Sequence, residues 1–492
     1  MPNNQNLLLI TMDELHLEAL SCHGATSHST PNIDRLASES RWFTNAQTAS
    51  PLCLPSRVSI ATGLYPHSTK SISNLNGTSM DKKLDSLFSV LGSNGYRNSV
   101  AGKCHFVRVP YADVSGNLTK EYTHVRDYYT SLGIDRLYLN DGNAVSAWYY
   151  DDYARELDEA GLLDKYRDEV ADRSNQGIFD FPGPDYMHPD CRVGSKAVEM
   201  IETSGRENEF LWVSFSGPHY PINTPTSYLE RVDITKAIPR HTRDGEWEDT
   251  SKAHRESYHG GSFGADGCGY AKDRAQKSFD EVYWDRWRLR YFANVVLLDD
   301  QIGKILTAAK ERWGDNFITV FTADHGDLAG NHSLWGKNGA VYEDVLRVPL
   351  MIRDVGGGRH ERIDTRVSTL DIFPTCMKML GLPIPECEGI SLVGKTVERD
   401  ILLSEADYCF SMNKGRFKLA ILDYQPYGAR EAYTELYDLE NDPHEFVNLA
   451  IDPNNKDILD DMLREYAKIY KKYNYDGTIF LKGGVRPYWY AK

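Results

Sequence analysis

Three short apolar runs recur along the chain, and each ends in polar or glycine-rich sequence. The runs are Leu7–Thr11, Leu211–Phe215 and Phe317–Phe321. Uninterrupted apolar runs of this length are typical of strands that are buried on both faces of a parallel sheet. The segments that follow them read MDE, SGPHYP and TADHGD. Because ligands bind beyond the carboxyl ends of the strands in an open α/β sheet, we expect these segments to form one site.

Helical patterns separate the strands. They cover Thr30–Glu39, Leu84–Asn94 and Trp284–Glu311. Thr30 is a favoured N-cap residue, and Pro31 suits the first turn of a helix. Strands of this kind that alternate with helices predict an α/β fold.

The chain changes character towards its C-terminus. Strand-like runs at Asp400–Ser404 and Phe417–Leu422 precede a charged amphipathic helix at Lys456–Tyr473. We therefore predict a catalytic domain over residues 1–385 and a C-terminal α+β subdomain over residues 386–492.

Two stretches are predicted to be irregular, residues 182–189 and residues 240–279. The second is rich in glycine, histidine and charged residues, which indicates a long surface insertion at the rim of a pocket. Together with residues 107–190 it carries the Tyr, Trp, His and Arg side chains that would suit a sugar or an aryl group.

The formal net charge of −16 disfavours binding to nucleic acid or to an anionic membrane surface. An anionic substrate would need a locally positive pocket. None of the eight cysteines falls in a CxxC pair, which fits a reducing compartment. The run Leu7–Met12 is too short for a signal-peptide core or a membrane span, and no basic residue precedes it. We therefore expect a cytoplasmic protein with no nucleic-acid or membrane partner.

The most informative segment is Ser50–Arg57, which contains the pattern Cys-x-Pro-Ser-Arg between Cys53 and Arg57. It begins about 40 residues after the first strand and its acidic residues. An isolated cysteine is more often a buried free thiol, and a pattern this short also occurs by chance. In this position, however, it resembles the sulfatase family of the alkaline phosphatase superfamily, where the cysteine is oxidised to formylglycine, an aldehyde.

The resemblance implies covalent catalysis at Cys53. The hydrated aldehyde is a gem-diol, so one hydroxyl can attack sulfur and the other can later collapse to expel sulfate. An ordinary serine or cysteine lacks this exit route. The resemblance also implies a formylglycine-generating enzyme as a partner during maturation.

Two further segments resemble the metal-binding blocks of this family. Asp13 and Glu14 follow the first strand, where relatives usually carry two adjacent acids, so Glu14 is a mild departure. Asp324 and His325 stand where relatives have Asp followed by Asn or His. The resemblance implies one divalent metal bound by these four residues together with Cys53. Members of the family usually bind Ca²⁺, whereas the imidazole of His325 is a ligand that also suits Mn²⁺.

The sulfate group is expected to meet a cluster of basic residues. By resemblance, Lys103 and Lys337 bind sulfate oxygens with Arg57 nearby, His105 assists sulfate release, and His219 protonates the leaving oxygen. Such a cluster would supply the positive pocket that an acidic protein needs for an anionic substrate.

Smaller matches and departures complete the comparison with the family. Asn74 stands where relatives have a polar contact near the sulfate. Cys104 replaces the more usual Trp, and Leu64 replaces the more usual Arg. We do not expect Leu64 to prevent conversion, which requires mainly Cys53, Pro55 and Arg57 of the same motif.

The resemblance covers nearly the whole chain and implies an alkaline-phosphatase-like sandwich: a large, mostly parallel central sheet flanked by helices, plus the small C-terminal subdomain. It implies a sulfatase close to arylsulfatases, choline-sulfatases and phosphonate monoester hydrolases. The rival activities are a phosphonate monoester or phosphodiester hydrolase with the same site, and a silent binding protein with unconverted Cys53. The sequence leaves open a sulfated saccharide, an aryl sulfate or an alkyl sulfate as substrate, and also the oligomeric state.

Overall fold

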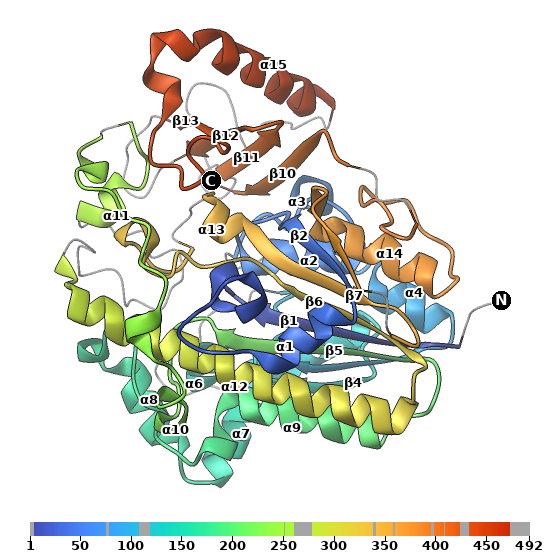
Figure 1. Cartoon of the computed structure of the whole chain (residues 1–492). Helices are drawn as coiled ribbons and strands as arrows, with labels where there is room; N and C mark the ends of the chain where they lie inside the picture. Colours follow the sequence, from blue (N-terminus) through green and yellow to red (C-terminus); the bar gives the residue numbers. More distant parts are fainter. Residues whose placement is uncertain are drawn as a thin grey trace.

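The three predicted strands lie side by side in the middle of a nine-stranded sheet in the computed structural model (Figure 1). Strand β1 (Asn6–Asp13) pairs in parallel with β5 (Glu209–Pro218) on one side and with β6 (Phe317–Ala323) on the other. All three are buried along their whole length, which explains their apolar sequences. The structure describes residues 4–74, 78–107, 119–249, 251–259, 278–337, 341–357, 360–394, 398–407, 409–423 and 432–472.

The other strands extend this sheet on both sides in the order β4-β3-β5-β1-β6-β7-β2-β8, with β9 paired to β2. β3 and β4 continue the parallel arrangement, whereas β7 runs antiparallel to both β6 and β2. The predicted mixed, mostly parallel sheet is therefore confirmed. The bounds are β2 Arg41–Gln47, β3 Arg97–Gly102, β4 Arg136–Leu139, β7 Arg347–Arg353, β8 Glu361–Ile363 and β9 Val367–Ser368.

Helices cover both faces of the central sheet. Figure 1 shows α1, α9 and α12 on one face, and α2, α4 and α14 on the other. This arrangement confirms the expected layers of helix, sheet and helix. The bounds are α1 Pro31–Ser38, α2 Cys53–Thr62, α4 Leu87–Ser93, α9 Pro189–Glu202, α12 Glu281–Trp313 and α14 Ile372–Met379.

The predicted helices are confirmed with shifted ends. The Asp280 side chain accepts the N–H of Tyr283, and Gly314 ends the helix at φ 65°, so α12 extends beyond its predicted bounds at both ends. α4 starts later than predicted because Ser86 forms a capping box with Ser89.

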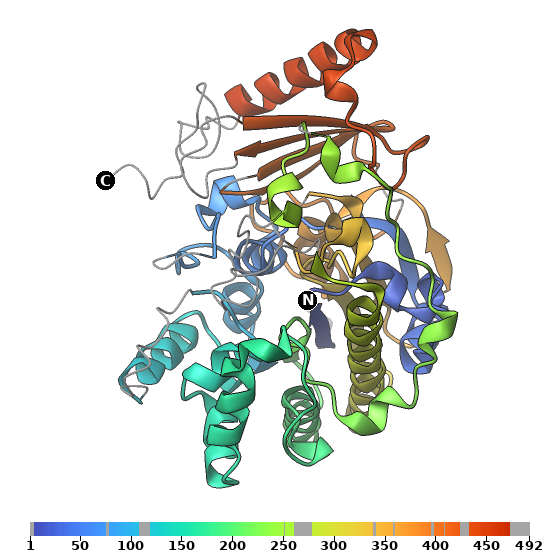
Figure 2. The same ribbon diagram turned by 90° about the vertical axis from the view of Figure 1, so that its left-hand side faces the viewer.

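A second, antiparallel sheet of four strands forms the C-terminal part, in the order β10-β11-β12-β13. Helix α15 (Lys456–Lys472) covers it, as Figure 2 shows from the side. Its apolar core includes Phe410, Leu419 and Met462, and also Tyr65 from the N-terminal part of the chain. The α+β character is as expected, and the boundary at residue 385 stays a prediction. The bounds are β10 Ile401–Ala406, β11 Cys409–Lys414, β12 Phe417–Asp423 and β13 Ala432–Asp438.

The stretch predicted to be an insertion is only partly described. It holds a 3-10 turn at Glu246–Glu248 and the short helix α11 (Arg255–His259), while residues 250 and 260–277 lie outside the described residues. Among the described residues, no helix has the length and apolar character to cross a membrane.

Candidate active site

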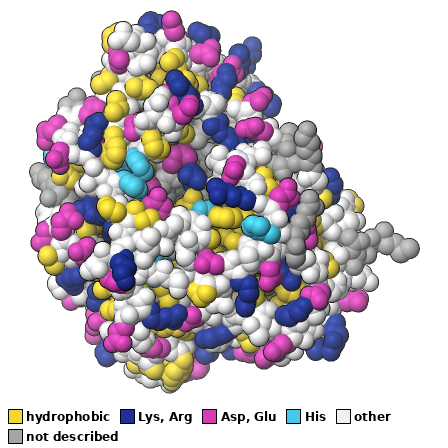
Figure 3. All heavy atoms as spheres, viewed as in Figure 1, with side chains coloured by type: hydrophobic (Ala, Val, Ile, Leu, Met, Phe, Trp, Pro, Cys, Tyr) yellow, Lys and Arg dark blue, Asp and Glu magenta, His cyan; other side chains and the backbone are white. Residues whose placement is uncertain are grey.

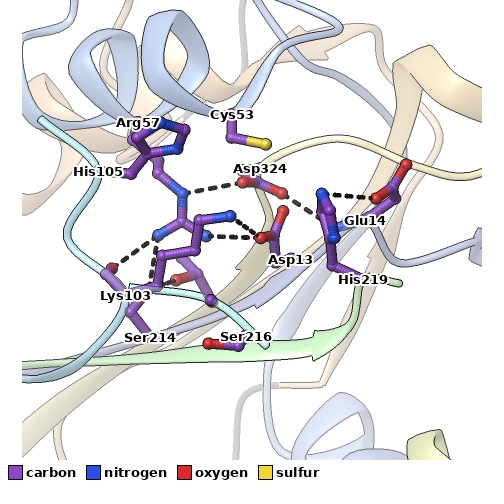
Figure 4. A network of polar contacts seen from close by, with 12 residues as sticks. Asp13, Glu14, Cys53, Arg57, Lys103, His105, Ser214, Ser216, His219 and Asp324 are labelled. Carbon is purple, nitrogen blue, oxygen red and sulfur yellow. Dashed lines mark hydrogen bonds and ion pairs between the residues drawn. The ribbon is translucent and has the colours of Figure 1, made fainter. Parts of the chain in front are cut away.

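Four predicted metal ligands meet at the ends of the central strands. Asp13 ends β1, Asp324 and His325 follow β6, and Cys53 is the first residue of α2. Each offers one ligand atom, and these atoms all lie within 4.8 Å of one another. All four residues are buried, and Figure 4 shows Cys53 close to Asp13 and Asp324. The edge of the sheet therefore places the carboxylates, the imidazole and the thiol around one point.

Hydrogen bonds fix the orientation of these groups. His325 Nδ1 lies 2.9 Å from the carbonyl oxygen of Gly326, which can only accept, so Nδ1 carries the proton. The other ring nitrogen, Nε2, faces Cys53 Sγ at 3.1 Å. Asp324 Oδ1 accepts the backbone N–H groups of Glu14 and His325, at 3.1 and 2.9 Å. The imidazole and the carboxylate are therefore oriented before any ligand arrives.

The donor set fits a divalent cation. Asp13 Oδ1 is buried and has no hydrogen-bond partner among the described residues. A buried carboxylate oxygen without a partner is costly, and a metal ion would satisfy it. Two carboxylates and one imidazole suit Ca²⁺, Mn²⁺ and other ions that accept oxygen and nitrogen ligands.

Two buried cationic side chains, Arg57 and Lys103, pair with the carboxylates of Asp324 and Asp13. Arg57 Nε donates to Asp324 Oδ2 at 2.9 Å, and its Nη1 donates to Ser214 Oγ at 2.6 Å. Lys103 Nζ pairs with Asp13. Burial by itself would raise the pKa of Asp13, but the charge of Lys103, with His219 and Arg57, holds that pKa well below its usual value. Asp13 is therefore an anion, as a metal ligand must be.

Glu14 lies beside this group of four and pairs with two basic residues, His219 and Lys337. Its Oε2 is 3.1 Å from His219 Nε2, and Lys337 Nζ lies 3.4 Å from its Oε1 and 3.2 Å from His219 Nε2. Burial, followed by the charge of Lys337, lowers the pKa of His219. Burial also raises the pKa of Glu14 against the charge of Lys337. Glu14 is thus next to the group of four, and its carboxylate is engaged by His219 and Lys337.

The turn after β3 presents Lys103 and His105. His105 has a left-handed backbone, with φ of 50°, which is uncommon for a residue other than glycine. Asp141 stabilises this turn, because its Oδ1 accepts the N–H groups of Cys104 and His105 at 3.2 and 3.1 Å. Asn74 stabilises the start of α2, because its Oδ1 accepts the N–H of Leu54 at 3.0 Å.

The structure thus gathers the residues predicted from the sequence motifs, and it adds several supporting side chains that sequence reasoning missed. Ser214 is a lone hydroxyl within the apolar run of β5, and that polar position was the only signal for it in the sequence. Asp327 accepts the N–H groups of Ala329 and Gly336, which anchors the loop that leads to Lys337. Asp327 belongs to the TADHGD segment, whereas no pattern indicated Asp141.

The comparisons agree with this geometry. The sulfatase family model matches residues 5–382, so the chain belongs to the sulfatase family. Enzymes of this family are sulfuric ester hydrolases, and this chain is one of them.

Individual relatives cover nearly the full length. The choline-sulfatase of Rhizobium meliloti (strain 1021) is 28% identical, over 91% of this chain and 83% of the relative. The arylsulfatase of Clostridium perfringens (strain 13 / Type A) is 26% identical, over 97% of both chains. The structure of a phosphonate monoester hydrolase from Agrobacterium radiobacter superposes with a TM-score of 0.77 at 21% identity, over 98% of this chain and 99% of that one. The last similarity shows the shared fold.

Proposed function

We propose that the protein hydrolyses an organic sulfate ester through a hydrated formylglycine formed from Cys53, beside one divalent cation. The observation that carries the proposal is the buried group of Asp13, Cys53, Asp324 and His325, with its ligand atoms within 4.8 Å of one another. A lone structural thiol has no need of two carboxylates, an imidazole and three basic side chains around it.

The metal would be held by Asp13, Asp324, His325 and the side chain at position 53. Glu14 stays a predicted fifth ligand, and its carboxylate pairs with His219 and Lys337 beside the group of four. A bound divalent cation supplies Lewis-acid polarisation and makes a nearby hydroxyl more acidic. We propose Ca²⁺, with Mn²⁺ as the alternative that the imidazole allows.

Side chains of the protein carry out the chemical steps of the hydrolysis. One hydroxyl of the hydrated side chain at 53 loses its proton to solvent and attacks sulfur, and the bond from sulfur to the ester oxygen breaks. Protonated His219 gives that oxygen a proton and regains one from solvent. His105 then accepts the proton of the second hydroxyl. The carbon–oxygen bond to sulfate breaks, the aldehyde re-forms, and water hydrates it again.

The basic residues stabilise the transferred group. Lys103 pairs with Asp13, and Lys337 pairs with Glu14. We infer that their ammonium groups bind sulfate oxygens, while Arg57 holds Asp324 and Asp13 in position. Fixed donors around a transferred group commonly supply the largest catalytic contribution.

The substrate class is proposed more broadly, as a sulfated saccharide or an aryl or alkyl sulfate. The rival activity is hydrolysis of a phosphonate monoester or a phosphodiester at the same site. His325 favours that rival, because phosphonate hydrolases of this kind also tend to carry Asp-His in the second metal segment.

Two comparisons test the proposal. Protein co-produced with a formylglycine-generating enzyme should turn over an aryl sulfate faster than an aryl phosphonate. Cys53→Ala should abolish that turnover, whereas the half-buried Cys387, changed to Ser as a matched control, should not matter. Faster turnover of the phosphonate would support the rival activity, and full activity of Cys53→Ala would refute the mechanism.

A further inference from the structure

A second cavity lies between the outer edge of the central sheet and the C-terminal sheet. Its volume is about 790 Å³, which is within the range of small-molecule sites. Its walls come from β2, β7 and β8, from residues 22–24, and from the C-terminal part of the chain. None of the residues that line it belongs to the sulfate or metal site.

Arginines dominate the charge of this cavity. Two of them are neutralised locally: Arg362 Nε lies 3.2 Å from Asp364, and Arg416 lies 3.3 Å from Asp438. Arg347 and Arg366 make no ion pair with any carboxylate in the described part of the chain. Guanidinium groups without a close ion pair are unusual around a cavity in a protein whose formal net charge is −16.

The three acidic residues of the lining, Glu343, Asp364 and Glu440, are outnumbered by its four arginines. Glu343 is held by the buried Lys418 at 3.2 Å and by Asn413 Nδ2 at 3.1 Å, and the charges of Lys418 and then Arg347 lower its pKa against the effect of burial, so it offsets only part of the positive charge. Burial, followed by the charges of Arg347 and Arg362, lowers the pKa of His23 to about 3. The imidazole is therefore neutral, and the positive field comes from the guanidinium groups.

An aromatic surface accompanies these charges. Trp42 is half-buried, donates from Nε1 to His23 Nε2 at 3.1 Å, and has the Arg362 guanidinium 5.6 Å from its ring centroid. Arg347 Nη2 donates to the carbonyl of Thr44 at 2.9 Å, which fixes that guanidinium on the wall. Figure 3 shows basic side chains gathered near the middle of this face, below the C-terminal part and beside hydrophobic side chains.

We propose that this cavity is a second binding site, for a ring compound that carries a sulfate or phosphate group. The planar guanidinium groups of Arg347 and Arg366 match two oxygens of such an oxyanion, and each can donate two parallel hydrogen bonds. Trp42 offers a flat apolar surface for the ring. The inference does not depend on conversion of Cys53, because it uses none of the catalytic residues.

Calorimetric titration of the Cys53→Ala protein tests this site without turnover. The probes are glucose 6-sulfate, glucose 6-phosphate, glucose and inorganic sulfate. We expect both esters to bind at the second site, glucose not to bind, and inorganic sulfate to bind at least tenfold more weakly than the esters. Equal affinity for inorganic sulfate and for the esters would overturn the role of the ring.

Arg366→Gln is the informative variant, because this side chain has no ion pair among the described residues that its loss could disrupt. We expect at least tenfold weaker binding of both esters at one site in Arg366→Gln. In protein with native Cys53, the same substitution should leave aryl sulfate turnover unchanged. Arg35→Gln, an exposed arginine on α1, is the control and should bind like the parent. Superimposable isotherms for Arg366→Gln and its parent would overturn the proposal.

Discussion

A buried histidine joins the N-terminal part of the chain to the C-terminal sheet, and it makes stability depend on pH. His67 lies on the short helix α3 (Pro66–Thr69), with its Nδ1 2.6 Å from Glu405 on β10 and its Nε2 3.4 Å from Glu388. The His67 side chain is 4% exposed, so solvent screens these pairs little. Burial by itself would lower the pKa of His67, but Glu405 and Glu388 outweigh it and raise the pKa to about 9.

The shift converts into a stability contribution with a defined pH window. A rise from the ordinary 6.5 to about 9 corresponds to about 3 kcal/mol of unfolding free energy, at 1.36 kcal/mol for each pKa unit. The folded state binds the proton more tightly than the unfolded state. The contribution of His67 is therefore fully present below pH 6.5 and is lost as the pH rises through about 9.

The perturbation is His67→Gln, and the assay is urea unfolding across this pH range. Wild type should lose about 3 kcal/mol relative to His67→Gln between about pH 6 and about pH 10. His360→Gln, an exposed histidine near the carbonyl of Ala37, is the matched control and should run parallel to wild type. If the curves of wild type and His67→Gln were also parallel, the assigned ion pairs would be wrong.

Three further perturbations follow from the site. Asp141→Ala should lower kcat roughly tenfold or more with little change in KM, because the turn that presents His105 loses its acceptor, and Asp141→Asn should retain most of the rate. Ser214→Ala leaves a buried Arg57 donor without its acceptor, so thermal unfolding should show a loss of about 1–3 kcal/mol. Chelation of divalent metal should abolish turnover and lower the unfolding midpoint, and added Ca²⁺ or Mn²⁺ should restore both; an unchanged midpoint would argue against a metal at Asp13.

The sequence predicted the centre of the molecule well, for a physical reason. Strands β1, β5 and β6 are buried on both faces, so they appear as apolar runs, and the predicted site residues Asp13, His219, Asp324 and His325 lie at or just beyond their ends. By contrast, β3 reads RNSVAG and has no such run, although its end presents Lys103. Its strand conformation comes from pairing with β5, which is a tertiary effect.

The supporting residues could not be predicted in the same way. Asp141 acts on a turn 36 residues away in the chain, and Glu405 meets His67 across 338 residues. Neither pairing produces a periodic pattern or a motif in the sequence. The second cavity could not be predicted from the sequence either, because Trp42, Arg347 and Arg366 come together only when the C-terminal sheet packs beside β2 and β8. Such features depend on long-range packing, whereas motifs record local sequence.

The central claim is that an aldehyde at position 53 carries the hydrolysis. Its most direct test measures aryl sulfate turnover against the fraction of the Cys53 peptide whose mass is lower by about 18 Da, the change expected when the thiol becomes an aldehyde. Preparations of different conversion should fall on a straight line through the origin. Appreciable turnover by wholly unconverted protein would contradict the account.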